Sequence, residues 1–354
     1  MDQILVVDDN LANLKNIQLQ LSDGYNYQVV LAKSGAQALQ ICIQRIPDLI
    51  LLDVDMPEMD GFETLSRIKD NPLLTRIPVI FLTANHDMST EIRALESGVV
   101  DFITKPVERS ILHHRLQLHL NLARYQQNLE ETVKELEDSI VLSFSEMIES
   151  RDKNTGDHVQ RTRIYVTLLG RELIAQGHFA GELNEKELSL ITRAALLHDI
   201  GKIGISDTIL LKPGRLDDTE FNIMKTHTTI GAEILETMYK RTPTQYYLKY
   251  AKQIAEWHHE KYDGSGYPHG IKGEAIPLCS RIMAVADVYD AVVADRIYRK
   301  AMTPQEAYNL IVDGKGTHFD PAVIDAFMAV RSELEAVARR RSAKTEAAAV
   351  QVPS

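Results

Sequence analysis

Histidine and aspartate side chains recur beside apolar segments along the second half of the chain. His198 and Asp199 directly follow the apolar run in "AALLHDIGKIGIS", and His258 and His259 lie in "EWHHEKYDGSGYP". A buried imidazole or carboxylate needs a partner, which can be a protein dipole, an opposite charge or a metal ion. A lone histidine in this setting is more often a satisfied core residue than a ligand, so the interpretation depends on the whole set. The candidate ligands are His158, His198, Asp199, His227, His258, His259 and Asp287.

This set of residues predicts a centre with more than one metal ion. Successive helical residues point about 100° apart, so the pairs His198–Asp199 and His258–His259 could each serve two neighbouring ions, with an aspartate as the bridge. Imidazole and carboxylate ligands without thiolates suit iron, manganese, zinc, nickel or cobalt, and affinity order alone does not choose among them. We expect two divalent ions, with iron or manganese as the first choice and nickel, zinc or cobalt as alternatives. Paired ions of this kind typically serve phosphoester hydrolysis.

Lys202 follows His198 by four residues, which places both on one face if the helix continues. Its ammonium group could then stabilise negative charge on a phosphorus centre under attack. The alternative is an ordinary solvated surface lysine, and the adjoining metal ligands favour the catalytic interpretation.

A second group of polar residues lies in the first third of the chain. Short apolar strands, "ILVVD", "YQVVLA", "DLILLD", "IPVIFLTA" and "VDFIT", alternate there with segments of helical period, which predicts an α/β domain with a doubly wound, parallel five-stranded sheet. Ligands bind at the carboxyl ends of such strands. The polar residues at these ends are Asp8, Asp9, Asp53, Thr83 and Lys105. Converging carboxylates repel one another, so they predict a Mg²⁺ site beside which a phosphoryl group could be held.

The elements that must position these residues divide the chain into domains. Its 354 residues suffice for two domains with separate cores. Strand patterns disappear from residue 149 onward, so the second domain is expected to be all-α. We expect the α/β domain at residues 1–120, a helical linker at 121–148, the all-α domain at 149–338 and a disordered tail at 339–354.

The linker contains a stripe of apolar residues at spacings of four, three, four and seven, which is typical of a short coiled coil. The stripe consists of Leu129, Val133, Leu136, Ile140 and Met147. A parallel homodimer and packing of the stripe on one of the two domains are equally good interpretations. His113, His114 and His119, at the start of the same helix, are expected to be surface residues.

The formal net charge of −11 disfavours broad contact with DNA or an anionic membrane surface. The longest apolar runs are too short to cross a bilayer, and the first residues show no secretory signal pattern. Cys42 and Cys279 cannot form a disulfide framework. These features together predict a cytoplasmic protein without membrane insertion.

The α/β segment resembles the receiver domain of two-component response regulators, matching it in "VVDDN", "LLDVDMPEMDG", "LTA" and "TKP". The resemblance implies that Asp53 accepts a phosphoryl group from a cognate histidine kinase. By the same resemblance, the Mg²⁺-binding, phosphoryl-binding and aromatic switch residues are Asp8, Asp9, the carbonyl of Asp55, Thr83, Lys105 and Phe102.

The second domain resembles the HD-GYP family of HD phosphohydrolases, through "HDIGK" and "HHEKYDGSGYP" in this order. The resemblance implies hydrolysis of cyclic di-GMP to pGpG or GMP, under control of phosphorylation at Asp53. It also assigns the seven candidate ligands to metal, and Lys202, His198 and Asp199 to catalysis. The substrate-binding residues implied are Tyr267, Asp290, Arg296 and Arg299.

Two details of this resemblance carry conditions. Arg296 follows Asp287 by nine residues, so a continuing helix would turn it to the opposite side, and the helix is expected to end near Ala294. Otherwise Arg296 and Arg299 belong to a solvated helix end. Asn154 stands where some family members have a glutamate for a third metal, which favours two ions here.

Other functions remain open at this point. The metal centre could stabilise an interaction module whose "YDGSGYPHG" loop binds a diguanylate cyclase. An HD hydrolase of another nucleotide is a further alternative. The complete ligand set and Lys202 favour an enzyme, because a structural metal site needs no adjacent cation.

Overall fold

The computed structural model describes residues 1–22, 27–84, 97–151, 157–294 and 301–339. The chain forms two compact units, Met1–Lys134 and Glu135–Ser354. Residues 340–354, which belong to the tail expected to be disordered, lie outside these described ranges.

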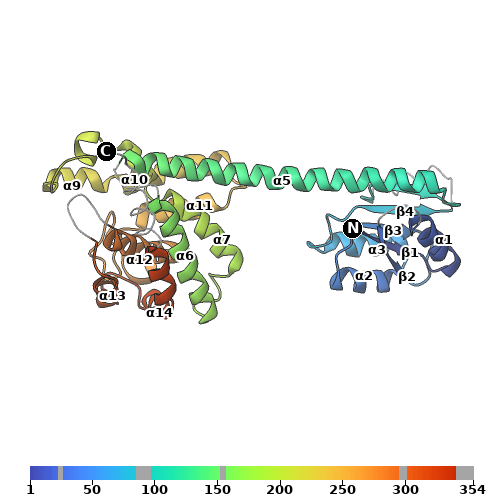
Figure 1. The fold of residues 1–354 in the computed structure, drawn as a ribbon. Helices are drawn as coiled ribbons and strands as arrows, with labels where there is room; N and C mark the ends of the chain where they lie inside the picture. Colours follow the sequence, from blue (N-terminus) through green and yellow to red (C-terminus); the bar gives the residue numbers. More distant parts are fainter. Residues whose placement is uncertain (23–26, 85–96, 152–156, 295–300, 340–354) are drawn as a thin grey trace, which may run out of the picture. The chain divides into compact units, whose positions relative to one another are not determined.

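The first unit contains a parallel sheet in the strand order β2-β1-β3-β4-β5 (Figure 1). Its strands are β1 (Asp2–Val7), β2 (Tyr27–Ala32), β3 (Leu49–Asp53), β4 (Val79–Thr83) and β5 (Asp101–Thr104). All four strand pairs are parallel, and the order reverses direction at β1. The predicted five-stranded, doubly wound sheet is therefore confirmed.

Alternate residues of each strand face opposite layers of helices, as the two-residue period of a strand requires. Ile4 and Val6 of β1 pack in one core with α1 (Leu11–Ser22) and the start of α5 (Arg109–Arg151). Leu5 and Val7 face the other core, formed with α2 (Gly35–Gln44) and α3 (Gly61–Asp70). The central strands β1, β3 and β4 are thus buried on both faces, and their polar ends are left at one edge.

Helix α5 is 43 residues long and contributes to both units. Its first turns bury Leu112, Leu116 and Leu120 against the sheet. The expectation for the nearby histidines was wrong in part, since only His114 is exposed. His113 is buried and its Nε2 lies 3.0 Å from the carbonyl of Gln20, while Nε2 of His119 lies 3.0 Å from Asp101.

The apolar stripe of the linker lies in the middle and at the end of α5. All five of its residues are exposed in the single chain. Packing of the stripe on either unit is therefore not observed in the part of the chain that the structure describes, and the coiled-coil interpretation stays a prediction.

The second unit is helical, as predicted, and its named elements include no strand within the described residues. Its helices after α5 are α6 (Asp157–Ala175), α7 (Glu185–Ala194), α8 (Asp207–Leu210), α9 (Asp218–Lys225), α10 (His227–Arg241), α11 (Tyr247–Trp257), α12 (Leu278–Val293), α13 (Pro304–Asp313) and α14 (Pro321–Ala329). Three 3-10 turns accompany them, η1 (Ala195–Leu197), η2 (Ile200–Gly204) and η3 (Gly273–Ala275).

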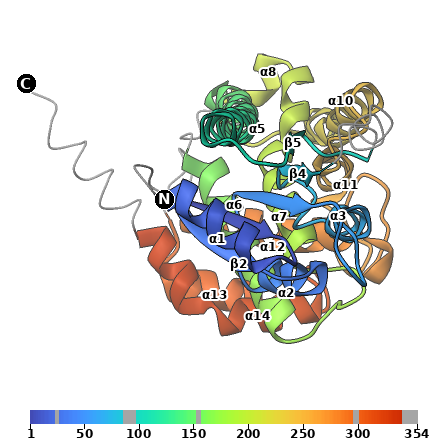
Figure 2. The same cartoon turned by 90° about the vertical axis from the view of Figure 1, so that its right-hand side faces the viewer.

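Helix α12 runs through the core of this unit. Ile282, Met283, Val285 and Ala286 are successive or near-successive residues, and all are buried. A helix that is apolar all round needs neighbours on every side. Helices α6, α11, α13 and α14 contact it, and α10 lies alongside α11 (Figure 2). No helix within the described ranges is both long enough and apolar enough to span a membrane.

Candidate metal centre

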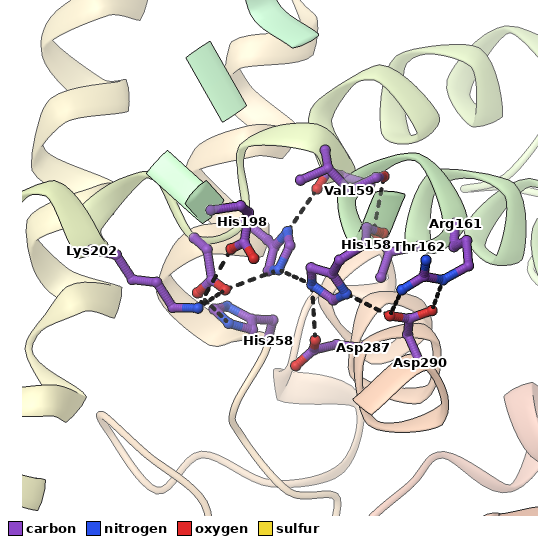
Figure 3. Close-up of polar contacts among 12 residues, drawn as sticks. His158, Val159, Arg161, Thr162, His198, Lys202, His258, Asp287 and Asp290 are labelled. Carbon is purple, nitrogen blue, oxygen red and sulfur yellow. Dashed lines mark hydrogen bonds and ion pairs between the residues drawn. The ribbon is translucent and has the colours of Figure 1, made fainter. Parts of the chain in front are cut away.

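The predicted ligands come from five separate parts of the helical unit and meet at one place, where Figure 3 labels His158, His198, His258 and Asp287. His158 lies on the first turn of α6, and His198 and Asp199 lie in the link between η1 and η2. His227 begins α10, His258 and His259 directly follow α11, and Asp287 lies within α12. Most of them lie at helix ends, and Asp287 lies within a helix, so their side chains extend from rigid elements rather than from long loops.

Asp199 is shared by two clusters of ligand atoms. One cluster comprises Asp199, His227, His258 and His259, and the other comprises Glu149, His158, His198 and Asp199; within each, the atoms lie within 4.8 Å of one another. Oδ1 of Asp199 is 3.3 Å from Nε2 of His227, and Oδ2 is 3.2 Å from Nε2 of His198. The carboxylate therefore has one oxygen toward each cluster, as a bridging ligand would.

The histidine rings are oriented by their backbone hydrogen bonds. In His198, His227 and His258, Nδ1 donates to a backbone carbonyl of an earlier residue, over 3.0, 2.7 and 2.9 Å respectively. A carbonyl can only accept, so in the neutral ring Nε2 carries the lone pair. Nε2 of His227 and Nε2 of His258 are buried and make no hydrogen bond within the described residues. Buried lone pairs aimed at a shared carboxylate fit metal coordination.

The rings of His158 and His198 repeat this arrangement on the other side of Asp199. Their Nε2 atoms lie 3.4 Å apart, and Nε2 of His158 is 3.6 Å from Asp287. Nδ1 of His158 donates to Asp290 at 2.7 Å, and the same carboxylate binds the guanidinium of Arg161 at 2.6 and 2.8 Å. Two facing ring nitrogens beside a carboxylate form an arrangement that a shared cation stabilises, so this cluster also fits a metal ion.

The electrostatic environment differs between the two sides. Burial lowers the pKa of His258 to about 4 and holds the pKa of His259 well below its ordinary value, so both rings are neutral ligands near neutral pH. Burial also acts on His198, but the charges of Asp199, Asp287 and Glu149 outweigh it and raise the pKa of that ring to about 9. Carboxylates thus concentrate around His198, a field that attracts a cation.

Lys202 lies beside the bridging carboxylate. Its Nζ is 2.8 Å from Oδ2 of Asp199 and 3.4 Å from Oε1 of Glu149. The expected continuous helix is absent, because α7 ends at Ala194 and the chain goes on as η1 and η2. The lysine therefore reaches the site from a 3-10 turn rather than from the same α-helical face as His198.

Gly201 allows this turn to approach α10 closely. A Cβ built at Gly201 would lie 1.8 Å from the carbonyl oxygen of His227 and 2.5 Å from the amide nitrogen of Gly231. Backbone atoms cannot move aside as a flexible side chain can. The glycine in "HDIGK" therefore brings Asp199 and Lys202 to the start of the helix that carries His227.

The loop after His259 folds back over that ring. Tyr267 lies with its ring centroid 4.8 Å from that of His259, and its amide donates to the carbonyl of His259. A Cβ at Gly266 would meet the backbone of Glu260 and Lys261 at 2.5 and 2.3 Å. The loop thus places an aromatic ring at the edge of the metal cluster.

The sheet of the first unit carries a separate site. Nζ of Lys105 lies 2.8 Å from Asp8 and 2.8 Å from Asp53, and Asp8, Asp9 and Asp53 can together reach one ion. Thr83 ends β4, Phe102 lies in β5, and Asp55 is exposed after β3. Burial raises the pKa of Asp53 despite the opposing effect of Lys105.

Comparison with known families matches a domain to each unit. Residues 4–117 match the response regulator receiver domain, and residues 143–323 match the HD domain. The chain belongs to the HD-domain response regulators. It is 41% identical over 340 residues, 92% of this chain and 77% of the relative, to a Vibrio cholerae protein named "Probable cyclic di-GMP phosphodiesterase". It is also 36% identical over 342 residues, 94% and 89% of the two chains, to a Xanthomonas campestris "Cyclic di-GMP phosphodiesterase response regulator RpfG".

Some predicted residues of this HD-domain response regulator lie elsewhere or outside the described ranges. Arg296, Arg299 and Asn154 belong to segments that the structure does not describe. Helix α12 ends at Val293 and Ala294 is extended, in agreement with the condition derived for Arg296. Asp290 is buried between His158 and Arg161, a placement that favours orientation of His158 over contact with substrate.

Sequence reasoning missed Glu149. It lies on the last turns of α5, is buried, and offers a carboxylate to the cluster of His158 and His198 as well as to Lys202. The segment "SEMIESR" resembles any solvated helix end. The sequence offers no signal for its burial, because nothing in this segment distinguishes Glu149 from the neighbouring Glu146.

Proposed function

We propose that this response regulator hydrolyses cyclic di-GMP to linear pGpG, and onward to GMP as a slower step, under control of its receiver. The observation that carries the proposal is the bridging position of Asp199 between two histidine clusters, with Lys202 at its side. The names of relatives that match most of the chain support the choice of substrate.

Two divalent transition metal ions fit the clusters, and we propose iron or manganese, with nickel, zinc and cobalt as alternatives. When bound, such ions supply an activated water and withdraw charge from a phosphate. The fit rests on the buried Nε2 atoms of His227 and His258 and on the facing Nε2 atoms of His158 and His198. Asp287 completes the set beside His158, and Glu149 is an additional carboxylate within reach.

The remaining steps belong to side chains around the clusters. Lys202 keeps its ammonium beside Asp199, where it can bind a phosphate oxygen and stabilise the charge that develops in the transition state. Tyr267 covers His259 and offers a ring edge and a hydroxyl to the substrate. Burial raises the pKa of that hydroxyl, so it stays protonated and can donate a hydrogen bond. Arg296 and Arg299 are proposed to bind the substrate's phosphate or guanine groups.

In the receiver, we propose that Asp53 takes a phosphoryl group from a cognate histidine kinase with Mg²⁺ held at Asp8, Asp9 and Asp53. A phosphoryl group adds charge and acceptor oxygens that Lys105 and Thr83 can engage. The exposed apolar stripe of α5 is proposed to pair with that of a second chain in a homodimer.

The test is incubation of the metal-reconstituted, full-length protein with cyclic di-GMP, followed by chromatography of the products. We expect pGpG to accumulate. A second candidate substrate is another cyclic dinucleotide, because residues of this chain are 40% identical over 214 positions, 58% of this chain and 38% of the relative, to a Vibrio cholerae "3'3'-cGAMP-specific phosphodiesterase 2". Equal or faster cleavage of 3'3'-cGAMP would favour that substrate, and a metal-loaded protein that cleaves neither but binds a diguanylate cyclase would favour an interaction module.

A further inference from the structure

Arg151, the last residue of α5, is hydrogen-bonded to the segment that carries Lys202. Nη1 of Arg151 donates to the carbonyls of Lys202 and Ile203, both at 3.3 Å, and Nη2 donates to the carbonyl of Ile205 at 3.2 Å. Nη2 also binds the carboxylate of Asp207 at 2.7 Å. One guanidinium thus holds three carbonyls in and directly after η2, together with the first residue of α8.

A segment as short as η2 depends on partners of this kind. It has five residues, and 3-10 hydrogen bonds are poorer in geometry than those of an α-helix. The last carbonyls of any helix also lack donors from within the helix. The planar guanidinium supplies several donors in a fixed arrangement, which a lysine or glutamine cannot do.

The same end of α5 also reaches the head of Lys202. Glu149, two residues before Arg151, lies 3.4 Å from Nζ of Lys202, which Asp199 binds from the other direction at 2.8 Å. Both the backbone and the ammonium group of Lys202 therefore contact the final turn of α5. The metal clusters do not explain the contacts of Arg151, since its side chain carries a positive charge and binds backbone carbonyls and Asp207.

We propose that Arg151 is a positioning residue, which fixes η2 on the end of α5 so that the ammonium group of Lys202 stays beside Asp199. Helix α5 then determines the position of Lys202 through its last residue, Arg151. A shift or rotation of α5 changes the rate of hydrolysis because it moves Lys202. The proposal rests on the proposed function in one respect only, namely that the rate is measured with the phosphodiesterase reaction.

The experiment compares Arg151→Gln with Arg193→Gln in the full-length, metal-loaded protein. Arg193 is a matched control because it also ties its element to α5, through Glu137 at 3.1 Å and Asp138 at 2.8 Å, but it does so from α7 rather than from η2. We expect Arg151→Gln to lower kcat by about tenfold to a hundredfold, since small displacements of a catalytic group have effects of this size. KM and the metal content should stay unchanged, and Arg193→Gln should keep kcat within about twofold.

A second readout does not require turnover. Hydrogen exchange of the peptide that covers residues 200–205 should be faster in Arg151→Gln than in the unmodified protein, and Arg193→Gln should leave it unchanged. In a double-mutant cycle, Arg151→Gln should cost no further rate once Lys202 is replaced by alanine, because it acts through that lysine.

The outcomes separate this proposal from the proposed function. Rates are measured with cyclic di-GMP and with bis(4-nitrophenyl) phosphate, a simple phosphodiester. Inactivity of the unmodified protein toward both would refute the proposed function, and the exchange measurement would then decide the role of Arg151. Unchanged exchange in Arg151→Gln, or a loss of rate that adds fully to that of Lys202→Ala, overturns the positioning role.

Discussion

Asp290 accepts a hydrogen bond from Nδ1 of His158 at 2.7 Å, and the same carboxylate binds Arg161 through both of its oxygens. Burial would raise the pKa of Asp290, but the bonds from Arg161 and His158 outweigh it and lower the pKa to about 2. The carboxylate is therefore ionised, and it fixes the His158 ring with Nε2 toward Asp287 and His198.

Asp290→Asn is expected to weaken metal binding at the cluster of His158 by about tenfold to a hundredfold, because a partner that orients a ligand ring has effects of this size. The measurement is Mn²⁺ titration of the metal-free protein. The matched control is Asp320→Asn, which also removes the carboxylate from a buried arginine, Arg281, away from the candidate ligands. Equal weakening in both variants would assign the effect to lost stability rather than to His158.

The shared position of Asp199 predicts a distinctive pattern of metal loss. Two transition metal ions per chain are expected in the absence of Mg²⁺. His227→Ala should remove mainly one of them and His158→Ala mainly the other, whereas Asp199→Asn should weaken both, because its oxygens face both clusters. Elemental analysis after dialysis gives the stoichiometry. Loss of a single ion in Asp199→Asn would contradict the bridging role.

The positions of residues could be predicted where a local sequence pattern determines them. Asp53 ends a strand buried on both faces, and the geometry of a parallel sheet then leaves it at the same edge as Asp8 and Lys105. His198 and Asp199 follow an apolar run, so a buried partner was required. In each case the residue type indicates the chemistry, and the apolar neighbours in the sequence indicate that the residue is buried.

The unpredicted part depended on contacts between distant segments. Glu149 and His113 lie on a long helix whose pattern does not reveal which turns another element covers. The break between η1 and η2 was missed because "AALLHDIGK" contains no residue that stops a helix before Gly201. Beyond the break, the close fit of Gly201 against His227 requires a glycine, and this fit becomes visible only when α10 is in place.

Lys202→Ala should lower kcat by about a hundredfold and leave the metal content unchanged, because removing one group that stabilises a developing charge has this effect. The measurement is the steady-state rate of cyclic di-GMP hydrolysis together with elemental analysis. Lys212→Ala is the control, since that lysine pairs with Glu220 of α9. A rate equal to that of the unmodified protein would make Lys202 an ordinary surface lysine.

The carboxylate of Asp101 makes the stability of the first unit depend on pH. Burial raises its pKa, but hydrogen bonds from Arg115 and His119 outweigh burial and lower the pKa below its ordinary value. A lowered pKa stabilises the folded state above the unfolded pKa of about 4, and this contribution is lost as the pH falls through the folded value.

Asp101→Asn should therefore speed hydrogen exchange of β4 and β5 near neutral pH, and the difference from the unmodified protein should shrink in acid. Exchange rates are corrected for the intrinsic rate at each pH. Asp70→Asn, at an exposed helix end, is the control. A difference that is constant from neutral pH into acid would exclude the proposed ionisation effect.

Phosphorylation of Asp53 is expected to activate hydrolysis through α5. The phosphoryl group would draw Lys105 away from its present contacts with Asp8 and Asp53. Strand β5 directly precedes this lysine, and the chain leads from it through Pro106 into α5.

Beryllofluoride with Mg²⁺ serves as a stable mimic of the phosphoryl group. The rate of cyclic di-GMP hydrolysis and the oligomeric state, from light scattering, are measured with and without it. Asp53→Asn should abolish the response. Asp48→Asn is the control and should retain it, because the carboxylate of Asp48 accepts a hydrogen bond from the backbone amide of Gln3 and takes no part in the phosphorylation site. If both the rate and the oligomeric state are the same with and without beryllofluoride, the receiver does not control this reaction through α5.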